Sequence, residues 1–495
     1  MDFSLDAYHA WCDRQDRDFL LADEERGGEP DERLMQYIWQ HQRIHRDALQ
    51  TVDGRRCEVL HPGFWNRGSG PDFTQALIRL DGGMLLSGDV EIDRAAAGWR
   101  AHGHDRNPSF ENVVLRVVWF PPRELSSSIP LLALEPSVDG SPCEMSSGFA
   151  TDSFALPVEF LGKCQVPLSG LSTEQVQGVL RAVAKSRFRQ KAEQLQLRAC
   201  DLGWHLALWE GLVAGLGYSK NTWPMRRIGE LTPRLFKGFP SEPLCFWSSP
   251  EVEARLFGVA GFLPEDSSSL QQAHVARLWD VWWRIRDEFS DVIFPNAMWH
   301  FAGLRPHNHP HRRLALVAHW IQRLDFFPRL DGWFMEAAPD ESLELLMNAL
   351  TVEAAPFWSK RFHFRRSSSG VSPLMIGHSR AIDLAVNVIL PWFWSRAQAE
   401  QNEALMQRAE QLFYSFPRSE ENRLLKDGCR RLLGREDLKV LVTAADQQGL
   451  LQILRDFCAH SNAVCDRCRF PDLIRSLGVA YAMSNERDAE FCLPQ

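Results

Sequence analysis

The chain has 495 residues, of which 45% are apolar, so it is long enough for about three domains and too apolar to be disordered throughout. Lys and Arg total 55 against 64 Asp and Glu; the net charge of -9 excludes a wholly basic nucleic-acid coat protein but not a local basic groove. No apolar run approaches the roughly 20 residues that a membrane helix needs, and the N-terminus lacks a signal-peptide pattern. We therefore expect a cytoplasmic protein without a membrane partner.

Residues 1–125 are predicted to form an α/β domain. Residues 31–46 place apolar side chains at helical spacing behind an acidic start, which predicts an amphipathic helix. The pattern then changes to that of strands at residues 57–61, 73–80, 84–92 and 112–120, and the last of these is apolar enough to be buried. Residues 94–111 leave room for a short helix and a loop. The predicted order is helix, three strands, helix, strand.

The rest of the chain has a different character. Residues 126–170 are rich in Pro and Ser and predict a linker that packs on other parts of the protein. Residues 171–450 are predicted to form a helical domain, because apolar faces recur there at three-to-four spacing. Residues 451–495 form a cysteine-containing tail. The fold class predicted is therefore α+β, an N-terminal α/β core followed by a large all-helical region.

Three acidic residues mark the predicted second and third strands. Asp72 lies at the mouth of the strand at 73–80, and Asp89 and Glu91 lie on the strand at 84–92. Residues two apart on a strand point to one face, and neighbouring strands lie about 4.8 Å apart. We therefore expect Asp72 and Glu91, with Asp89 as an auxiliary ligand, to share one Mg²⁺ or Mn²⁺ ion that orients a water molecule for phosphoryl hydrolysis.

Two histidines follow this strand. His102 and His104 are candidate catalytic residues, since a histidine beside a metal can donate to a phosphate or accept a proton near neutral pH. The alternative is that they cap a helix and order the loop. Glu32 at the start of the first helix is either an outer metal ligand or a charge favoured by the helix dipole.

The order of these elements and acids resembles the core of the PD-(D/E)XK nucleases. Pro71-Asp72 and Asp89-Val90-Glu91 match the motif of that superfamily except at its Lys, which this chain lacks. Glu91-Ile92-Asp93 is an alternative register of the same motif. The resemblance implies a nuclease fold and metal-dependent hydrolysis of DNA or RNA.

A longer resemblance covers nearly the whole chain. Residues 61–80, 88–93 and 98–118 resemble the bacterial family called domain of unknown function 2851, and so do residues 215–221, 304–315, 387–394 and the terminal CDRC. The activity of that family is unassigned. Its pattern has His after Val-Glu-Ile, where this chain has Asp93, and this departure makes Glu91 a safer candidate ligand than Asp89.

The cysteines suggest a second metal site. Eleven cysteines at mostly irregular spacing do not suit a secreted disulfide framework and indicate a reducing compartment. The tail gathers candidate ligands for a tetrahedral Zn²⁺ ion at Cys458, His460, Cys465 and Cys468. Four ligands so close together make a tight loop, so a remote cysteine is the alternative to His460: Cys164, Cys429 or Cys492. Some of the resembled nucleases bind an Fe-S cluster through one distant and three terminal cysteines, which makes such a cluster with Cys164 the secondary interpretation.

Basic residues cluster locally in the acidic chain. Arg and Lys interleaved with Phe and His are suited to backbone phosphates and stacked bases. The candidate nucleic-acid-binding residues are Arg305, Arg313, Arg365 and Arg366. The alternative is that these clusters are solvated helix faces.

Together these patterns predict a Mg²⁺- or Mn²⁺-dependent nuclease that acts on DNA or RNA. The main alternative is a catalytically inactive module that kept the nuclease fold and binds nucleic acid or protein. A hydrolase of small phosphorylated molecules is a third interpretation.

Overall fold

The structure is a computed structural model of residues 1–495. The residues that it describes are 5–6, 8–10, 12, 30, 32–66, 70–83, 85–122, 128–138, 162–240, 247–264, 272–352, 355–364, 374–434, 439–458, 465 and 468–477. The chain divides into two compact units. The first contains Met1–Ser172, Asp427–Glu436 and Leu451–Gln495, and the second contains Thr173–Lys426 and Asp437–Leu450.

The first unit contains a mixed six-stranded sheet in the order β1-β3-β4-β5-β6, with β2 paired to β3. The strands are β1 (Cys57–His61), β2 (Phe64–Trp65), β3 (Phe73–Leu80), β4 (Leu85–Ile92), β5 (Val113–Val118) and β6 (Leu131–Ala133). β1, β3 and β4 run antiparallel, whereas β4-β5 and β5-β6 are parallel. The four predicted strands are confirmed. β2 and β6 were not predicted, and β6 lies within the predicted linker.

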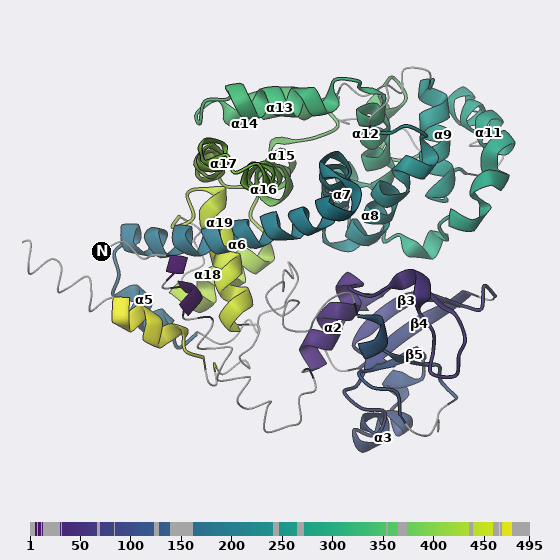
Figure 1. The fold of residues 1–495 in the computed structure, drawn as a ribbon, viewed down its shortest axis with the longest axis horizontal. Helices are drawn as coiled ribbons and strands as arrows, with labels where there is room; N and C mark the ends of the chain where they lie inside the picture. Colours follow the sequence, from purple (N-terminus) through teal and green to yellow (C-terminus); the bar gives the residue numbers. More distant parts are fainter. Residues whose placement is uncertain are drawn as a thin grey trace, which may run out of the picture. The chain divides into compact units, whose positions relative to one another are not determined.

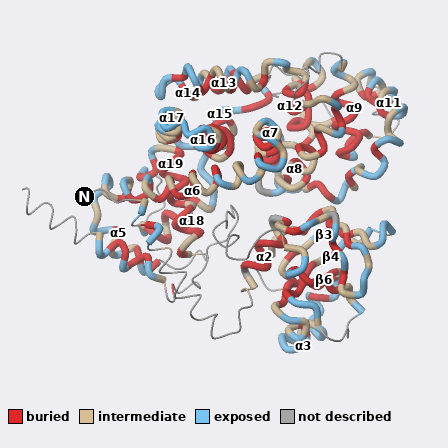
Figure 2. The backbone as a smooth tube through the Cα atoms, in the orientation of Figure 1, coloured by how far each residue is buried: buried red, intermediate tan, exposed pale blue. Residues whose placement is uncertain are grey.

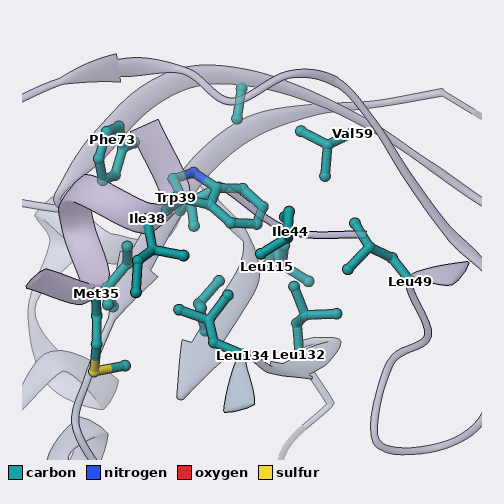
Figure 3. Close-up of a cluster of buried hydrophobic side chains, with 14 of the residues drawn as sticks. Met35, Ile38, Trp39, Ile44, Leu49, Val59, Phe73, Leu115, Leu132 and Leu134 are labelled. Carbon is teal, nitrogen blue, oxygen red and sulfur yellow. The ribbon is translucent and has the colours of Figure 1, made fainter. Parts of the chain in front are cut away.

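Helix α2 (Glu32–His41) packs against the sheet. Its apolar residues join those of the strands in one buried core, which includes Met35, Ile38, Trp39, Phe73 and Leu115 (Figure 3). Trp39 also donates through Nε1 to the Pro62 carbonyl over 2.9 Å. The helix is therefore fixed on the sheet by burial along one face and by a hydrogen bond to the strand connection.

The parallel pairing of β4 with β5 needs a crossover, which contains α3 (Gly98–Ala101), η2 (His104–Arg106) and η3 (Pro108–Phe110). Trp99 and Phe110 from this crossover are buried against Val113 of β5. The crossover places its histidines and arginines beside the ends of β4 and β5. Half of the residues of β3 and half of those of β4 are buried, while α3 is mostly exposed (Figure 2).

The second unit is helical. Its helices are α6 (Thr173–Leu202), α7 (Trp204–Leu216), α8 (Tyr218–Leu235), α9 (Ser249–Val259), α11 (Ala273–Ile285), α12 (Pro310–Gln322), α13 (Phe326–Glu336), α14 (Ser342–Leu350), α15 (His378–Leu384), α16 (Leu390–Ala399) and α17 (Glu403–Ser415). α6 packs against α7 and α16, and α9 packs against α11 and α12 (Figure 1). None of the helices in the described part of the chain is long and apolar enough to cross a membrane.

The first unit also contains helices outside the sheet region. One is α5 (Gln165–Ser169), which precedes α6. Two later helices, α18 (Arg423–Leu433) and α19 (Ala444–Ile453), each begin in the second unit and end in the first. η10 (Leu454–Cys458) follows α19, and residues 470–477 are helical. The observed class is thus α+β, a curled sheet followed by a mostly helical region, as the sequence predicted.

Candidate functional site

Asp72 and Glu91 meet where β3 begins and β4 ends. The backbone N–H of Asp72 donates to Glu91 Oε2 over 3.0 Å, and the backbone N–H of Ile92 donates to Asp72 Oδ2 over 2.9 Å. The strand register explains this meeting, because Phe73 lies opposite Val90 and each acid is next to one of these partners. The structure therefore brings together the two carboxylates that the sequence paired.

Both carboxylates are held in a poorly solvated place. Burial is the main cause that raises the pKa of Asp72 to about 7 and that of Glu91 to about 9, and the charge of Asp72 raises the pKa of Glu91 further. Two acids in this situation repel each other when both are ionised. A divalent cation bound by both would favour their ionised forms, and carboxylate oxygens are the hard ligands that Mg²⁺ and Mn²⁺ prefer.

Helix α2 supports Asp72 through an amide side chain. Gln36 Nε2 donates to Asp72 Oδ1 over 2.8 Å and to Glu32 Oε1 over 3.1 Å. Glu32 lies near enough for its charge to raise the pKa of both Asp72 and Glu91. Sequence reasoning named Glu32 but missed Gln36, although both residues lie on one face of the helix, four positions apart.

Asp93 is a third acid beside this pair, and its charge is paired with the guanidinium of Arg116. Its buried side chain lies 3.7 Å from Arg116 Nη2, and Arg116 also donates to the Ala96 carbonyl over 2.8 Å and lies over the Trp99 ring. Burial raises the pKa of Asp93, while the positive charge of Arg116 lowers it in part. Arg116 lies opposite Glu91 in the parallel pairing of β4 and β5, a relationship that no local sequence pattern reveals.

The predicted histidines lie next to these acids. His104 Nδ1 is 3.2 Å from Glu91 Oε1, and its ring stacks on Phe110 with 4.1 Å between the ring centroids. His102 Nδ1 is 3.4 Å from Asp93 Oδ1 and its side chain is 57% exposed. Asp93, His102 and His104 can bring one ligand atom each within 4.8 Å of one another, so this group could also hold a metal ion.

Burial lowers the pKa of His104 below its usual value. Its imidazole is therefore mainly neutral at pH 7, with one ring nitrogen able to donate and the other able to accept a hydrogen bond.

Asp89 stands apart from these interactions. Its Oδ1 accepts a hydrogen bond from the backbone N–H of Gln75 over 3.1 Å, at an irregularity in the pairing of β3 with β4. Gln75 has a positive φ of 59° there. Glu91 and Asp93, two positions apart at the end of β4, are thus the acids that flank His104, and this matches the alternative register of the motif.

A cavity of about 730 Å³ opens beside His104. Its lining residues come from the crossover, from β5 and from the segment before β6. The charged or titratable ones are Arg100, His104, Asp105, Arg106, Glu111 and Arg116. Three arginines and two acids line the cavity, and the charge of one of these arginines, Arg116, is offset by Asp93 outside the lining.

The predicted nucleic-acid-binding arginines have different surroundings. Arg305 is exposed and pairs with Glu420. Arg313 is buried, and its guanidinium donates to the Met375 carbonyl, Tyr218 Oη and Asn308 Oδ1. These bonds hold Arg313 inside the helical unit, so it is not placed to contact a nucleic acid. Arg365 and Arg366 lie outside the described residues.

The predicted tail ligands are described in part. Cys458, Cys465 and Cys468 belong to the first unit, as does Cys164, whereas His460 lies outside the described residues. The three tail thiols all lie close enough to Cys164 for their charges to raise its pKa, although burial is the larger cause. Among the described residues, however, these cysteines do not form a group whose ligand atoms all lie within 4.8 Å of one another.

A family model matches residues 32–423, which is most of the chain. The chain belongs to the DUF2851 family of proteins of unknown function. The match includes the whole sheet, the acid pair and Cys164, and ends before Cys458, Cys465 and Cys468. No curated protein and no solved structure matches this DUF2851 protein.

Proposed function

We propose that this DUF2851 protein hydrolyses phosphodiester bonds of DNA or RNA with Mg²⁺ or Mn²⁺ held by Asp72 and Glu91. The observation that carries the proposal is the meeting of these two poorly solvated carboxylates, whose mutual repulsion a shared cation would relieve. The order of α2, β1, β3, β4, α3 and β5 supports it, because the resemblance to PD-(D/E)XK nucleases rests on that order.

Protein groups around the acids suit this chemistry. The divalent ion would supply a metal-bound water as nucleophile and offset the charge that develops on the phosphoryl group. Gln36 holds Asp72 in place from α2. His104, mainly neutral at pH 7, lies against Glu91 and can donate a hydrogen bond to a phosphate oxygen or accept a proton from a water molecule.

Arg116 offers a substitute for the missing lysine of the motif. In the register Glu91-Ile92-Asp93, the position of that lysine is taken by Asp93, which is paired with Arg116 of β5. The neighbouring strand thus places a guanidinium there, although Asp93 offsets its charge. Arg100 and Arg106 of the adjacent cavity would receive the flanking phosphates.

Cleavage of labelled DNA and RNA with Mg²⁺ or Mn²⁺ tests the proposal. Asp72→Asn and Glu91→Gln preserve side-chain shape but remove a ligand charge, so each should lower hydrolysis by orders of magnitude while the protein stays folded. Asp89→Asn is the matched control on the same strand and should keep most of the activity. Equal residual cleavage in the wild type and both site variants would contradict the proposal.

The non-catalytic alternative is favoured by one observation, the acid at the position of the motif lysine. If Asp93 marks a lost active site, the wild type will bind nucleic acid without cleaving it under any metal condition. Such binding should weaken steeply with added salt, because displaced counterions drive it. Charge reversal at Arg305, Arg365 and Arg366 tests the predicted basic surface in the same assay.

A further inference from the structure

Asp93, His102 and His104 form a second group of possible metal ligands beside the acid pair. Among the described residues, this is the only group of three or more His, Cys, Asp or Glu side chains whose ligand atoms all lie within 4.8 Å of one another. Asp93 directly follows β4, His102 directly follows α3, and His104 begins η2. The group therefore joins the end of a strand to the crossover that follows it.

The crossover holds the two imidazoles close together. Gly103, between them, has a φ of 75°, a conformation that glycine adopts most easily. The ring centroids of His102 and His104 lie 5.4 Å apart. The His104 ring also contacts Trp99 and Phe110, with 5.5 Å and 4.1 Å between the ring centroids. Imidazoles placed in this way need little reordering when an ion binds.

Asp93 is held with its two carboxylate oxygens beside different neighbours. Oδ1 lies 3.4 Å from His102 Nδ1, and Oδ2 lies 3.7 Å from Arg116 Nη2. The backbone N–H of Asp93 donates to the Val117 carbonyl over 3.0 Å, and a Cβ on Gly98 would lie only 2.6 Å from Oδ1. Main-chain pairing and close packing therefore keep Oδ1 beside the imidazole.

Two buried polar atoms of this group make no hydrogen bond within the part of the chain that the structure describes. They are His104 Nδ1 and Asp93 Oδ2. A buried polar atom without a hydrogen bond costs stability, and coordination of a metal ion through Nδ1 would give that nitrogen a partner. Glu91 Oε1 lies 3.2 Å from the same nitrogen. Its negative charge would favour a cation there and offset the guanidinium of Arg116.

We propose that Asp93, His102 and His104 bind one Zn²⁺ ion. Two imidazole nitrogens and one carboxylate oxygen suit Zn²⁺, whereas Mg²⁺ prefers oxygen ligands. Three protein ligands leave a tetrahedral ion one open position, as in catalytic zinc sites. His102 is 57% exposed and His104 lines the cavity, so water or a small anion can reach that position.

This ion is additional to the Mg²⁺ or Mn²⁺ ion of the proposed function, whose ligands are Asp72 and Glu91. A histidine binds a metal through one ring nitrogen and donates a hydrogen bond through the other. His104 would thus keep its role as a donor to a phosphate oxygen but would not accept a proton. Because metal binding is measured without substrate, the zinc site can be tested whether or not the protein cleaves nucleic acid.

Titration of the metal-free, full-length protein with Co²⁺, a visible probe for zinc sites, tests the proposal. We expect the visible bands of cobalt bound by nitrogen and oxygen, and their loss when Zn²⁺ displaces the cobalt. His102→Ala, at a half-exposed side chain, should lower the affinity for Co²⁺ at least about tenfold, because the loss even of groups that support metal ligands costs about 10–100-fold. Asp93→Asn should have the same effect. His45→Ala, at an exposed position of the same unit, is the matched control and should keep the wild-type affinity.

Asp72→Asn separates this site from the proposed nuclease ion, since it should keep cobalt binding while it loses hydrolysis. Loss of cobalt in Asp72→Asn with retention in His102→Ala would assign the ion to the acid pair and overturn the proposal. A spectrum that shows only thiolate-to-cobalt charge transfer, unchanged in His102→Ala, would place the ion on cysteines and would also overturn it. So would a folded wild type that takes up neither Co²⁺ nor Zn²⁺, a result that does not depend on the folding of any variant.

Discussion

The backbone N–H of Asp72 donates to the carboxylate of Glu91 over 3.0 Å, so the main chain itself ties one acid to the other. The backbone N–H of Ile92 in turn donates a hydrogen bond to the Asp72 carboxylate. These bonds fix both carboxylates before any substrate arrives. Preorganised ligands of this kind avoid the cost of ordering flexible side chains when a cation binds.

Mn²⁺ should therefore stabilise the folded protein. At a free Mn²⁺ concentration of about 100 times its Kd, the gain is about 2.7 kcal/mol, because the ion binds the folded state and not the unfolded chain. Thermal unfolding with and without Mn²⁺ measures it. Asp72→Asn and Glu91→Gln should abolish most of the shift, whereas Asp89→Asn should keep it. An equal shift in all four proteins would assign the ion to another site.

The pair of Asp93 and Arg116 should behave as a buried ion pair. Arg116→Met leaves Asp93 buried without its cation and should destabilise the sheet unit by about 3 kcal/mol. The double change Asp93→Asn with Arg116→Met should cost clearly less than the sum of the two single changes. Hydrogen–deuterium exchange of β4 and β5 peptides reports the effect on this unit.

A second ion pair on the same sheet gives the control. Arg79 and Glu58 lie 2.8 Å apart but are partly exposed, with 28% and 46% of their side chains accessible. Solvent screens such a pair, so Arg79→Met should cost no more than about 1 kcal/mol. Equal effects of Arg79→Met and Arg116→Met would contradict the importance of burial at Asp93.

His61 makes the stability of the sheet unit depend on pH. Burial lowers the pKa of His61 to about 4, and its Nδ1 accepts a hydrogen bond from the Gly63 N–H over 2.9 Å. Because the unfolded state takes up a proton near pH 6.5 and the folded state does not, stability is full above pH 6.5. The contribution of His61 to the free energy of unfolding then falls by about 3 kcal/mol as the pH drops from 6.5 towards 4.

Unfolding curves between pH 7.5 and pH 4 would reveal the contribution of His61. His61→Gln keeps a hydrogen-bond acceptor without a titrating group, so its stability should fall less than that of the wild type over this range. His45→Gln, at an exposed position of the same unit, should follow the wild type. Parallel curves for His61→Gln and the wild type would show that His61 does not control this loss.

The parts of the fold that the sequence predicted are those with long, regular patterns. β3 and β4 show strand alternation over eight residues each, and their register then determines that Asp72 and Glu91 meet. β2 and β6 are two and three residues long, too short for any periodicity. α8 lies within the predicted helical region but contains Pro224 and Pro233, which a helix interior does not favour.

The parts of the site that the sequence did not predict depend on contacts between distant segments. Arg116 reaches Asp93 through the parallel pairing of β4 and β5, which follows from the crossover and from no local pattern. Gln36 reaches Asp72 from another element. Likewise, the spacing of the tail cysteines gave no basis for choosing among the remote cysteines, and only the fold reveals that the charges of the tail thiols act on Cys164.

Gly98 permits the close packing of Asp93 against the crossover. A Cβ at position 98 would lie 2.6 Å from Asp93 Oδ1, and Asp93 cannot easily move because it is buried beside Arg116. Gly98→Ala should therefore displace Asp93 and destabilise the sheet unit by about 1–3 kcal/mol. If the proposed function holds, cleavage should fall as well, since Asp93 directly follows β4, two positions after Glu91.

Gly332→Ala in α13 is the matched control for this change. No atom lies within 4 Å of a Cβ built at Gly332, so alanine fits there, and its better helix propensity should leave stability unchanged or raise it by up to about 1 kcal/mol. Hydrogen–deuterium exchange of the β4 and α3 peptides should be faster in Gly98→Ala and unchanged in Gly332→Ala. Unchanged exchange in Gly98→Ala would mean that the crossover can shift to admit a methyl group, and that Asp93 is not held by its packing against position 98.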